Sequence, residues 1–427
     1  MRGAVAVDMG ATSARFSAGW LEDGELRFEV IEQIAHSPIE QNGRLNWDFD
    51  QLLNFTRRAA EYAAHRFSRS TLAIDTWGVD HGFIDAEGDL IMPPVAYRDQ
   101  SHARVYAEMA EQRDELFSLT GIQHQPFNTI YQLIARRKED PTLPLRARWL
   151  TLPDLIGYLL TRQMNWEFTM ASTTQLMGLD GNWSPRAFEL AGWDMPDFQP
   201  TLPGHIGGYV TDRVRLASVG SHDTASAVAG LSPITDSTIF LNVGTWSLIG
   251  CVVDIPIVSD SARTANLTNE RTVDGRVRLL KNVPGFYVIN RLHEELGVGG
   301  DVPQWLATAD MLVTARIDLD DEGLFNPKNL VEYVRNQLSQ SPRDHREWAG
   351  IALQSLIDAL AKVPYQLEAV TGRNFTEIRV GGGGSRSELF CETLATVTGL
   401  KVTKGAAECT VQGNLSVQFA AQKSVGY

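Results

Sequence analysis

Both halves of this chain open with the same pattern: an apolar strand, a turn of glycine and hydroxyl residues, and a second strand. In the first copy the turn is Gly10-Ala11-Thr12-Ser13, and apolar alternation resumes at residues 15–20. In the second copy, residues 237–250, the turn is Gly244-Thr245. A short turn between two strands predicts a hairpin rather than the start of a helix. Two such hairpins, one in each half, predict a duplicated domain.

The segments between the hairpins alternate between strand and helix patterns. Residues 72–75 form an apolar strand-like run, and residues 49–67 have helical periodicity. This alternation is typical of α/β domains. A helix-breaking Gly-Leu-Ser-Pro stretch occupies residues 230–233. We therefore predict an N-terminal domain of residues 1–230 and a C-terminal domain of residues 231–427.

Two acidic residues stand at the ends of predicted strands. Asp223 follows the apolar run of residues 214–220, in a small-residue segment that predicts a turn and the start of a helix. An acid at such a position is a candidate general base. Asp8 ends the first strand, directly before a turn whose small residues let backbone N–H groups approach phosphate oxygens. A carboxylate there can hold hydrated Mg²⁺. Together the two acids indicate phosphoryl transfer to an alcohol.

The composition indicates an acidic globular protein. The 427 residues are 43% hydrophobic and 21% charged, enough for two hydrophobic cores. The net charge of −14 argues against nucleic acid or an anionic membrane as a partner, because polyanions require a basic surface. Three cysteines without a CxxC pair predict neither a disulfide framework nor a zinc site. We expect a cytoplasmic protein without signal peptide or membrane span, monomeric or homodimeric, that binds a small molecule.

Several segments resemble one enzyme family. The two hairpin turns and the glycine run at residues 381–384 are similar, in this order, to the phosphate and adenosine motifs of the actin-like ATPases. Within that superfamily the chain is identified as a member of the FGGY carbohydrate kinases, most similar to those that act on L-rhamnulose. The segments that carry this similarity include Asn46-Trp47-Asp48, Ile74-Asp75-Thr76-Trp77-Gly78-Val79-Asp80, Ala96-Tyr97-Arg98-Asp99, Ser172-Thr173-Thr174-Gln175-Leu176, Asn266-Leu267-Thr268-Asn269-Glu270 and Leu280-Lys281-Asn282.

The resemblance implies a fold and a reaction. The fold is α/β, with two actin-like (ribonuclease H-like) ATPase domains and the active site in the cleft between them. The reaction is ATP-dependent phosphorylation of L-rhamnulose to L-rhamnulose 1-phosphate, as in L-rhamnose catabolism.

The resemblance also implies roles on the sugar side. Asp223 would be the general base that accepts the proton of the attacking hydroxyl. The residues expected to contact the sugar are Trp77, Gly78, His222, Thr224 and Asn282. For His222 the alternative is a packing or capping histidine, and for Trp77 it is a core tryptophan.

On the nucleotide side the resemblance implies a second set of contacts. The residues expected to bind ATP are Ala11, Thr12, Ser13, Ala14, Arg15, Thr245, Asn290 and Gly382. Asp8 would position Mg²⁺ through water, because Mg²⁺ loses its hydration shell reluctantly. For Arg15 the alternative is a solvated arginine of the hairpin. The chain contains no GxxxxGK[ST] sequence, which excludes a nucleotide site of the P-loop type.

Three departures from the family pattern qualify these implications. Asn290 stands where the family has a glutamine one methylene longer, and Arg386 stands where it has an asparagine near the adenosine. The chain ends at Tyr427, where the family continues for another helix or more, so we expect a shortened C-terminal domain that is less stable or supported by a subunit contact. The alternatives to an L-rhamnulose kinase are a kinase for another ketose, such as L-fuculose, and a sugar- or nucleotide-sensing relative without turnover.

Overall fold

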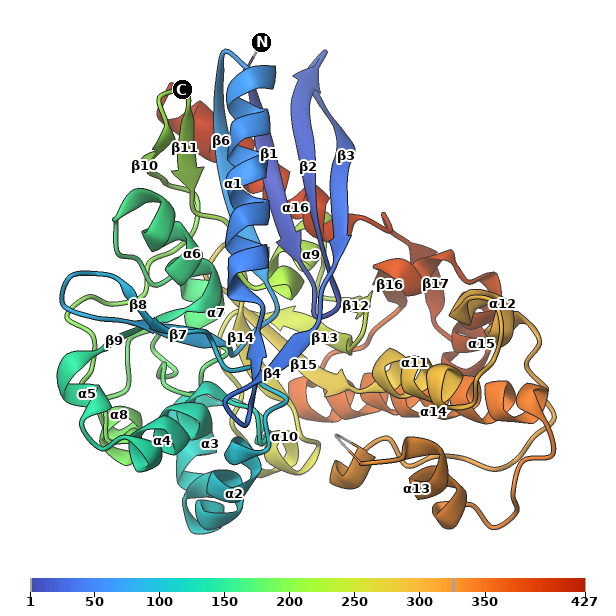
Figure 1. Cartoon of the computed structure of the whole chain (residues 1–427). Coiled ribbons are helices and arrows are strands. Elements are labelled where there is room, and N and C mark those ends of the chain that lie inside the picture. Colours follow the sequence, from blue (N-terminus) through green and yellow to red (C-terminus); the bar gives the residue numbers. More distant parts are fainter. Residues whose placement is uncertain (1, 325–326, 427) are drawn as a thin grey trace. The chain divides into compact units, whose positions relative to one another are not determined.

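The computed structural model describes residues 2–324 and 327–426, which form two compact units (Figure 1). Unit 1 comprises Met1–Ser232, Val253–Arg278 and Cys409–Tyr427, and unit 2 comprises Pro233–Val252 and Leu279–Glu408. The predicted boundary at residue 230 lies just before the first passage of the chain into unit 2. The units are not simply successive halves, since the chain returns to unit 1 twice.

Unit 1 contains most of the elements. Its strands are β1 (Arg2–Met9), β2 (Ser13–Glu22), β3 (Glu25–Ala35), β4 (Pro38–Gln41), β5 (Arg44–Trp47), β6 (Arg69–Thr76), β7 (His81–Ile84), β8 (Leu90–Met92), β9 (Arg148–Thr151), β10 (Ile206–Thr211), β11 (Val214–Ala217) and β14 (Thr268–Arg271). Its helices are α1 (Phe49–Arg66), α2 (Ser101–Glu108), η1 (Ala110–Gln112), α3 (Arg113–Thr120), α4 (Thr129–Glu139), α5 (Leu143–Arg146), α6 (Leu152–Thr161), α7 (Phe168–Ala171), α8 (Pro185–Ala191), α9 (Asp223–Gly230), α10 (Asp260–Thr264) and α16 (Cys409–Ser424).

The main sheet of unit 1 has six strands in the order β10-β11-β6-β1-β2-β3. β1 and β2 pair antiparallel, which confirms the first predicted hairpin. β6 runs parallel to both β1 and β11. In β1 and β6 every residue but the first is buried, as expected for parallel strands covered on both faces. Because parallel strands end at the same edge, the residues that follow β1, β6 and β11 are brought together there.

Helices α1 and α16 cover opposite faces of this sheet (Figure 1). On the α16 face, Ala4 and Ala6 of β1 form a buried cluster with Val411 and Leu415. Small side chains on the strand allow the helix to approach closely. This contact anchors the last described helix to the central strand of unit 1.

Alpha-helix α16 also inserts polar side chains into the sheet. Asn414, Gln418 and Gln422 follow one another at four-residue spacing and are buried. The side-chain amide of Gln418 donates to the carbonyl of Val5 at 3.0 Å, and that of Gln422 donates to the carbonyl of Gly3 at 2.9 Å. Their hydrogen bonds offset the cost of burying the amides. A buried polar face leaves no apolar stripe in the sequence, which is why sequence patterns did not predict this helix.

Unit 2 is built around the second hairpin. Its strands are β12 (Thr238–Val243), β13 (Ser247–Val253), β15 (Val277–Val283), β16 (Glu377–Gly381) and β17 (Lys401–Lys404), two of which begin or end in unit 1. Its helices are α11 (Gly285–Glu295), α12 (Val302–Ala307), η2 (Glu322–Leu324), α13 (Leu330–Gln337), α14 (His345–Thr371), η3 (Gly383–Arg386) and α15 (Glu388–Thr398).

The strands of unit 2 lie in the order β15-β13-β12-β16-β17. The antiparallel pairing of β12 with β13 confirms the second predicted hairpin. β16 pairs parallel with β12, and it ends at the predicted glycine run.

Across residues 2–324 and 327–426, every helix is too short or too polar to span a lipid bilayer.

Candidate active site

Three carboxylates meet where the parallel strands of unit 1 end. Asp8 of β1 and Asp75 of β6 are register partners. The residue after Asp75, Thr76, donates its backbone N–H to the carbonyl of Ser221 at 2.9 Å, which draws the segment after β11 to the same edge. That segment ends at Asp223, the first residue of α9, as predicted. Asp8 and Asp75 are buried, whereas 25% of the Asp223 side chain is exposed. Of the three, Asp223 is therefore the most accessible to a ligand.

Burial and repulsion between the carboxylates change the pKa values of these acids. Burial, together with the nearby charge of Asp8, raises the pKa of Asp75 well above its ordinary value, although Asn414 donates to its Oδ2 at 2.5 Å. The low-polarity surroundings also raise the pKa of Asp223. A carboxylate with a raised pKa is a stronger base than a solvated one, which suits proton abstraction near neutral pH.

Arg15 is anchored on Asp8. Its Nε and Nη2 donate to Asp8 Oδ2 at 2.9 and 2.7 Å. The alternative of a solvated hairpin arginine is therefore wrong, while a phosphate contact by Arg15 stays a prediction. Among the described residues no group of three His, Cys, Asp or Glu side chains could hold a metal by itself. That Asp8 holds a hydrated Mg²⁺, whose other ligands would come from phosphate and water, stays a prediction.

The turn after β1 is supported from behind by His36. The ring Nε2 of His36 lies 2.8 Å from the carbonyl oxygen of Gly10, and its backbone N–H donates to the carbonyl of Thr12 at 3.1 Å. Gly10 also donates its N–H to the carbonyl of Ser13 at 2.9 Å. Thr12 remains exposed and Ser13 half-buried. The loop therefore has a held backbone and accessible hydroxyls, and no sequence signal pointed to His36.

Trp77 belongs to a packed aromatic cluster. Its ring centroid lies 4.1 Å from that of Trp47, and only 6% of Trp77 is exposed. The indole N–H groups of Trp77 and Trp47 donate to Asp80 Oδ2 at 2.8 and 2.6 Å. This environment favours the alternative of a core tryptophan, and a sugar contact by Trp77 stays a prediction.

The next two residues form a strained turn beside His222. A Cβ added to Gly78 would lie 3.3 Å from Thr173 Cγ2 and 3.4 Å from His222 Nε2. Val79 has φ 69°, a left-handed conformation that is costly for a β-branched residue. Its N–H donates to Thr173 Oγ1 at 3.1 Å, and its carbonyl accepts from Thr129 Oγ1 at 2.5 Å. Hydrogen bonds on both sides thus hold the turn in its strained form.

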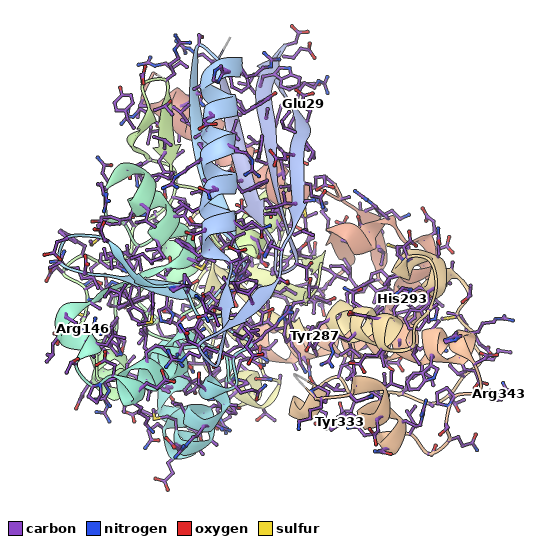
Figure 2. All side chains as sticks on the ribbon, viewed as in Figure 1. Glu29, Arg146, Tyr287, His293, Tyr333 and Arg343 are labelled. Carbon is purple, nitrogen blue, oxygen red and sulfur yellow. The ribbon has the colours of Figure 1, made fainter. Side chains whose placement is uncertain are left out.

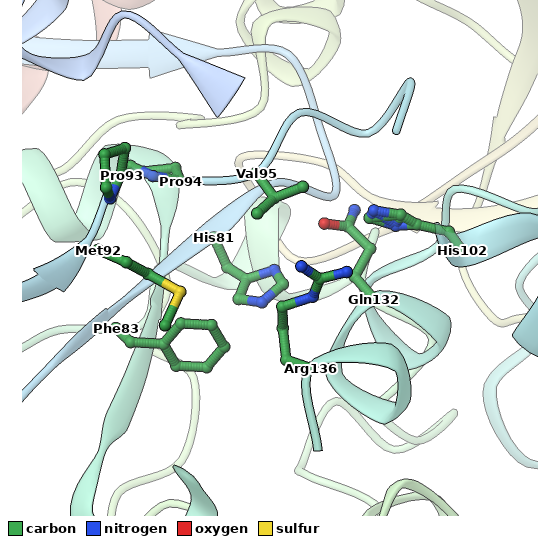
Figure 3. Close-up of a pocket in the computed structure, with 9 residues that line it drawn as sticks. All are labelled: His81, Phe83, Met92, Pro93, Pro94, Val95, His102, Gln132 and Arg136. Carbon is green, nitrogen blue, oxygen red and sulfur yellow. The ribbon is translucent and has the colours of Figure 1, made fainter. Parts of the chain in front are cut away.

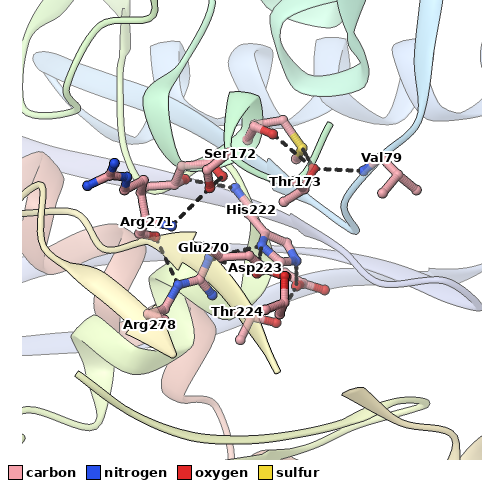
Figure 4. Close-up of polar contacts among 12 residues, drawn as sticks. Val79, Ser172, Thr173, His222, Asp223, Thr224, Glu270, Arg271 and Arg278 are labelled. Atoms are coloured by element: carbon pink, nitrogen blue, oxygen red, sulfur yellow. Dashed lines mark hydrogen bonds and ion pairs between the residues drawn. The ribbon is translucent and has the colours of Figure 1, made fainter. Parts of the chain in front are cut away.

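His222 lies between this turn and Asp223 (Figure 4). It precedes α9 as the N-cap residue, but its side chain makes no capping hydrogen bond, so the capping alternative is wrong. Its Nε2 is 3.5 Å from Asp223 Oδ1, and its Nδ1 faces Arg278 and Glu270. Thr224 Oγ1 donates to the same Asp223 oxygen at 3.0 Å. The structure therefore brings Gly78, His222, Asp223 and Thr224 together, as the resemblance implies.

A small cavity lies beside Gln132 in unit 1 (Figure 3). Its volume of about 10 Å³ is the space of one water molecule. It is lined by His81, Phe83, Met92, Pro93, Pro94, Val95, His102, Gln132 and Arg136. Gln132 connects the cavity to the site, because its Nε2 donates to Asp80 Oδ1 at 3.2 Å. Burial lowers the pKa of both His81 and His102 to about 3, so both rings are neutral.

Unit 2 brings the second hairpin turn next to the glycine run. Gly382 has φ 77°, and an added Cβ would lie 2.6 Å from the carbonyl oxygen of Val243, so only glycine fits. Tyr287 donates its backbone N–H to the carbonyl of Thr245 at 2.7 Å. The Tyr287 ring, labelled on α11 in Figure 2, stacks on Trp246 with centroids 6.2 Å apart. These contacts fix the backbone around two residues expected to bind ATP.

The remaining expected contacts of unit 2 are less defined. Asn282 is half-buried near the end of β15, and Asn290 is exposed on α11. Arg386 Nη2 pairs with Glu408 Oε1 at 2.9 Å, so this arginine is engaged within unit 2. The roles of Asn282 and Asn290 stay predictions.

Sequence reasoning assigned no role to several residues of the site. They are His36, Asp75, Asp80, Thr173, Glu270 and Arg278. Asp75, Asp80, Thr173 and Glu270 occur in the segments that resemble the kinases, but only strand pairing and helix packing show what they contact.

The two units have the α/β architecture of sugar kinases of the actin-like ATPase type, which confirms the predicted α/β fold of two such domains, while an active site in a cleft between them stays a prediction. The family description "FGGY family of carbohydrate kinases, N-terminal domain" matches residues 4–225, and the corresponding C-terminal domain description matches residues 239–422. The chain belongs to the FGGY family of carbohydrate kinases.

Solved structures agree on the fold. The chain is similar to ligand-bound xylulose kinase from Lactobacillus acidophilus, with 14% identity and a TM-score of 0.82 over 100% of this chain and 90% of that one. Gluconate kinase from the same organism gives 14% identity and a TM-score of 0.81 over 100% and 89% of the two chains. Plasmodium falciparum glycerol kinase with ADP has 11% sequence identity and a TM-score of 0.78, over 99% of this chain and 90% of that one. At these identities the likeness concerns the fold alone.

Proposed function

We propose that this carbohydrate kinase transfers the terminal phosphoryl group of ATP to the C1 hydroxyl of L-rhamnulose, with Asp223 as general base. The observation that carries the proposal is the position of Asp223. It opens α9, it is partly exposed, and its oxygen lies beside His222 and Thr224 at the edge where β1 presents Asp8 and the first phosphate-type turn. A base next to a phosphate loop is the arrangement that phosphoryl transfer to an alcohol requires.

Each group then has a defined task. Asp223 accepts the proton of the attacking hydroxyl, and Thr224 orients its carboxylate by donating to Oδ1 at 3.0 Å. The exposed Thr12 and half-buried Ser13 present hydroxyls, and the loop presents N–H groups, to the phosphates of ATP. When bound, Mg²⁺ neutralises phosphate charge, and Asp8 holds it through water. Gly382 has no side chain, which lets the glycine run pack directly against the second hairpin.

The choice of L-rhamnulose rests on the sugar-side segments. The similarity runs through residues 75–80, 97–99, 222–224 and Asn282, rather than only through the nucleotide turns that all relatives share. Buried polar groups built for one pattern of hydroxyls reject a sugar that misplaces one of them. The sugar-side similarity is what supports L-rhamnulose as the proposed substrate and L-rhamnulose 1-phosphate as the proposed product.

A coupled ADP-release assay over a panel of ketoses tests the proposal. We expect kcat/KM for L-rhamnulose to exceed that for L-fuculose, D-xylulose and glycerol by at least about tenfold. If one of these three equals or exceeds L-rhamnulose, the substrate assignment is wrong and the kinase assignment remains. Sugar binding by calorimetry without ADP release from any sugar would instead favour a sensing relative.

The role of Asp223 has its own test. We expect Asp223→Asn to bind sugar and nucleotide nearly as the parent does and to lower kcat by roughly 10²–10⁴-fold, because a positioned general base contributes about that much. Asp260→Asn is a suitable control, since the Asp260 side chain is 98% exposed. A kcat of Asp223→Asn within about threefold of the parent removes this residue from proton transfer.

A further inference from the structure

Three charged or ionisable side chains meet in the interior next to Asp223. His222, Glu270 and Arg278 have side-chain exposures of 8%, 7% and 0%. They come from the segment before α9, from β14 and from β15. Burying a guanidinium is costly unless its charge and donors are matched. Such an arrangement therefore needs a structural or functional reason.

The contacts at one ring nitrogen define the state of His222. Arg278 Nη2 forms a hydrogen bond with His222 Nδ1 at 3.1 Å (Figure 4). A guanidinium only donates, so Nδ1 must be the acceptor. Glu270 Oε2 lies 3.2 Å from both Nδ1 and Nη2, but within the described chain it meets hydrogen-bond geometry with neither. In a neutral imidazole that accepts at Nδ1, the proton is on Nε2.

The proton-bearing side of the ring faces the active site. Nε2 lies 3.5 Å from Asp223 Oδ1, and it is the atom that a Cβ on Gly78 would approach to 3.4 Å. The ring N–H is thus directed between the general base and the Gly78–Val79 turn. A sugar oxygen bound there would accept a hydrogen bond from it.

Glu270 supplies the charge that keeps Arg278 in place. Glu270 Oε2 and Arg278 Nη2 form an ion pair at 3.2 Å, so a carboxylate and a guanidinium are buried together. Arg278 Nε donates to the carbonyl of Arg271 at 2.9 Å, which fixes the guanidinium plane. The pair is therefore oriented as well as neutralised.

We propose that Arg278, paired with Glu270, is a positioning residue that holds His222 as the Nε2–H tautomer, so that His222 donates a hydrogen bond to a sugar oxygen beside Asp223. The tautomer follows from the contacts of Arg278 alone. The hydrogen bond to a sugar rests on the proposed function.

The tautomer can be measured directly. Long-range ¹H–¹⁵N spectra of ¹⁵N-histidine-labelled protein at pH 7 distinguish the two neutral tautomers and the imidazolium, and loss of a signal in His222→Gln identifies His222. We expect Nε2–H in the parent. An Nδ1–H or doubly protonated ring overturns the proposal.

Variants of the pair separate the roles of its members. Arg278→Met removes the donor to Nδ1 of His222, and Glu270 can then accept a hydrogen bond from Nδ1, so we expect His222 to switch to the Nδ1–H tautomer. If Arg278→Met folds and His222 keeps the Nε2–H tautomer, the proposal is overturned. In Glu270→Gln, Arg278 still donates, so we expect Nε2–H to persist, and a switch there overturns it. If Arg278→Met does not fold, the tautomer of His222 in Glu270→Gln still tests the proposal. Arg276→Met, in the turn between β14 and β15 and paired with Asp274, is the matched control and should leave the spectrum unchanged.

Kinetics complete the test. With the preferred sugar, we expect Arg278→Met to raise the sugar KM about tenfold, since one hydrogen bond to the substrate is lost, and Arg278→Lys to restore part of it. An unchanged sugar KM in a folded Arg278→Met overturns the sugar contact. A parent that shows the Nε2–H tautomer but phosphorylates no sugar would refute the proposed function and leave the tautomer assignment standing.

Discussion

Gly413 lies at the closest approach of α16 to α9, and replacing it with alanine would force these helices apart. A Cβ added to Gly413 would lie 1.8 Å from the carbonyl oxygen of Ser226 and 2.7 Å from the backbone nitrogen of Gly230. Ordinary contact begins at 3.4 Å, so the helices must separate by roughly 1.5 Å. Both obstacles are backbone atoms, which cannot rotate away as a side chain can.

The expected effect has two parts. Overpacking typically costs about 1–3 kcal/mol, and a backbone obstacle places Gly413→Ala at the upper end, about 3 kcal/mol. Because α9 begins with Asp223, the displacement also moves the proposed base. A misplacement of about 1 Å costs about 10²-fold in rate, so we expect kcat to fall about a hundredfold.

Urea unfolding followed by tryptophan fluorescence and ADP release with the preferred sugar measure the two parts. Ser416→Ala, on the exposed face of the same helix, is the control and should change the free energy of unfolding by less than about 0.5 kcal/mol. If Gly413→Ala unfolds like the control and its kcat stays within about threefold of the parent, the helix contact does not position Asp223.

Two further predictions concern the surroundings of the site. Burial lowers the pKa of His102 to about 3, below the value of about 6.5 in an unfolded chain, so its contribution to stability is complete above pH 6.5 and is lost as the pH falls toward 3. Between pH 7 and pH 5 the free energy of unfolding of the parent should therefore fall by about 2 kcal/mol more than that of His102→Gln. If the free energies of unfolding of the two proteins depend equally on pH, the His102 ring is not buried in its neutral form. Val79→Asn should raise the free energy of unfolding by about 1 kcal/mol, because asparagine tolerates the left-handed φ of 69° better than valine. A loss of stability in urea would show that contacts of the valine side chain outweigh the strain.

Local elements with strong signals could be predicted from the sequence. The turns Gly10-Ala11-Thr12-Ser13 and Gly244-Thr245 each join two apolar runs, and the β1–β2 and β12–β13 hairpins form there. Asp223 follows an apolar run and precedes small helix-forming residues, and α9 begins at that residue. The order of the motifs along the chain also sufficed to identify the family. In these cases the residues that cause the local structure are neighbours in the sequence, so a single segment is enough to predict it.

Helices without an apolar stripe could not be predicted in this way. In α16 the buried face carries Asn414, Gln418 and Gln422, whose amides bond to strands at the other end of the chain. In α14 buried residues extend over most of the helix and Pro364 lies inside it, so its pattern is not that of a surface helix. Both helices are stabilised by tertiary contacts rather than by their own periodicity.

The sequence by itself determined the residue types of the candidate site, namely the proposed base Asp223, the acid Asp8 and the glycine turns. Only the tertiary structure decided which groups surround them. Parallel pairing of β1 with β6 sets Asp75 beside Asp8, and Arg278 reaches His222 across 56 positions of the chain. The protonation of a carboxylate and the tautomer of a histidine depend on burial and on charges within a few ångströms. Because those neighbours come from distant segments, no local pattern encodes the chemical state in which Asp223 and His222 act.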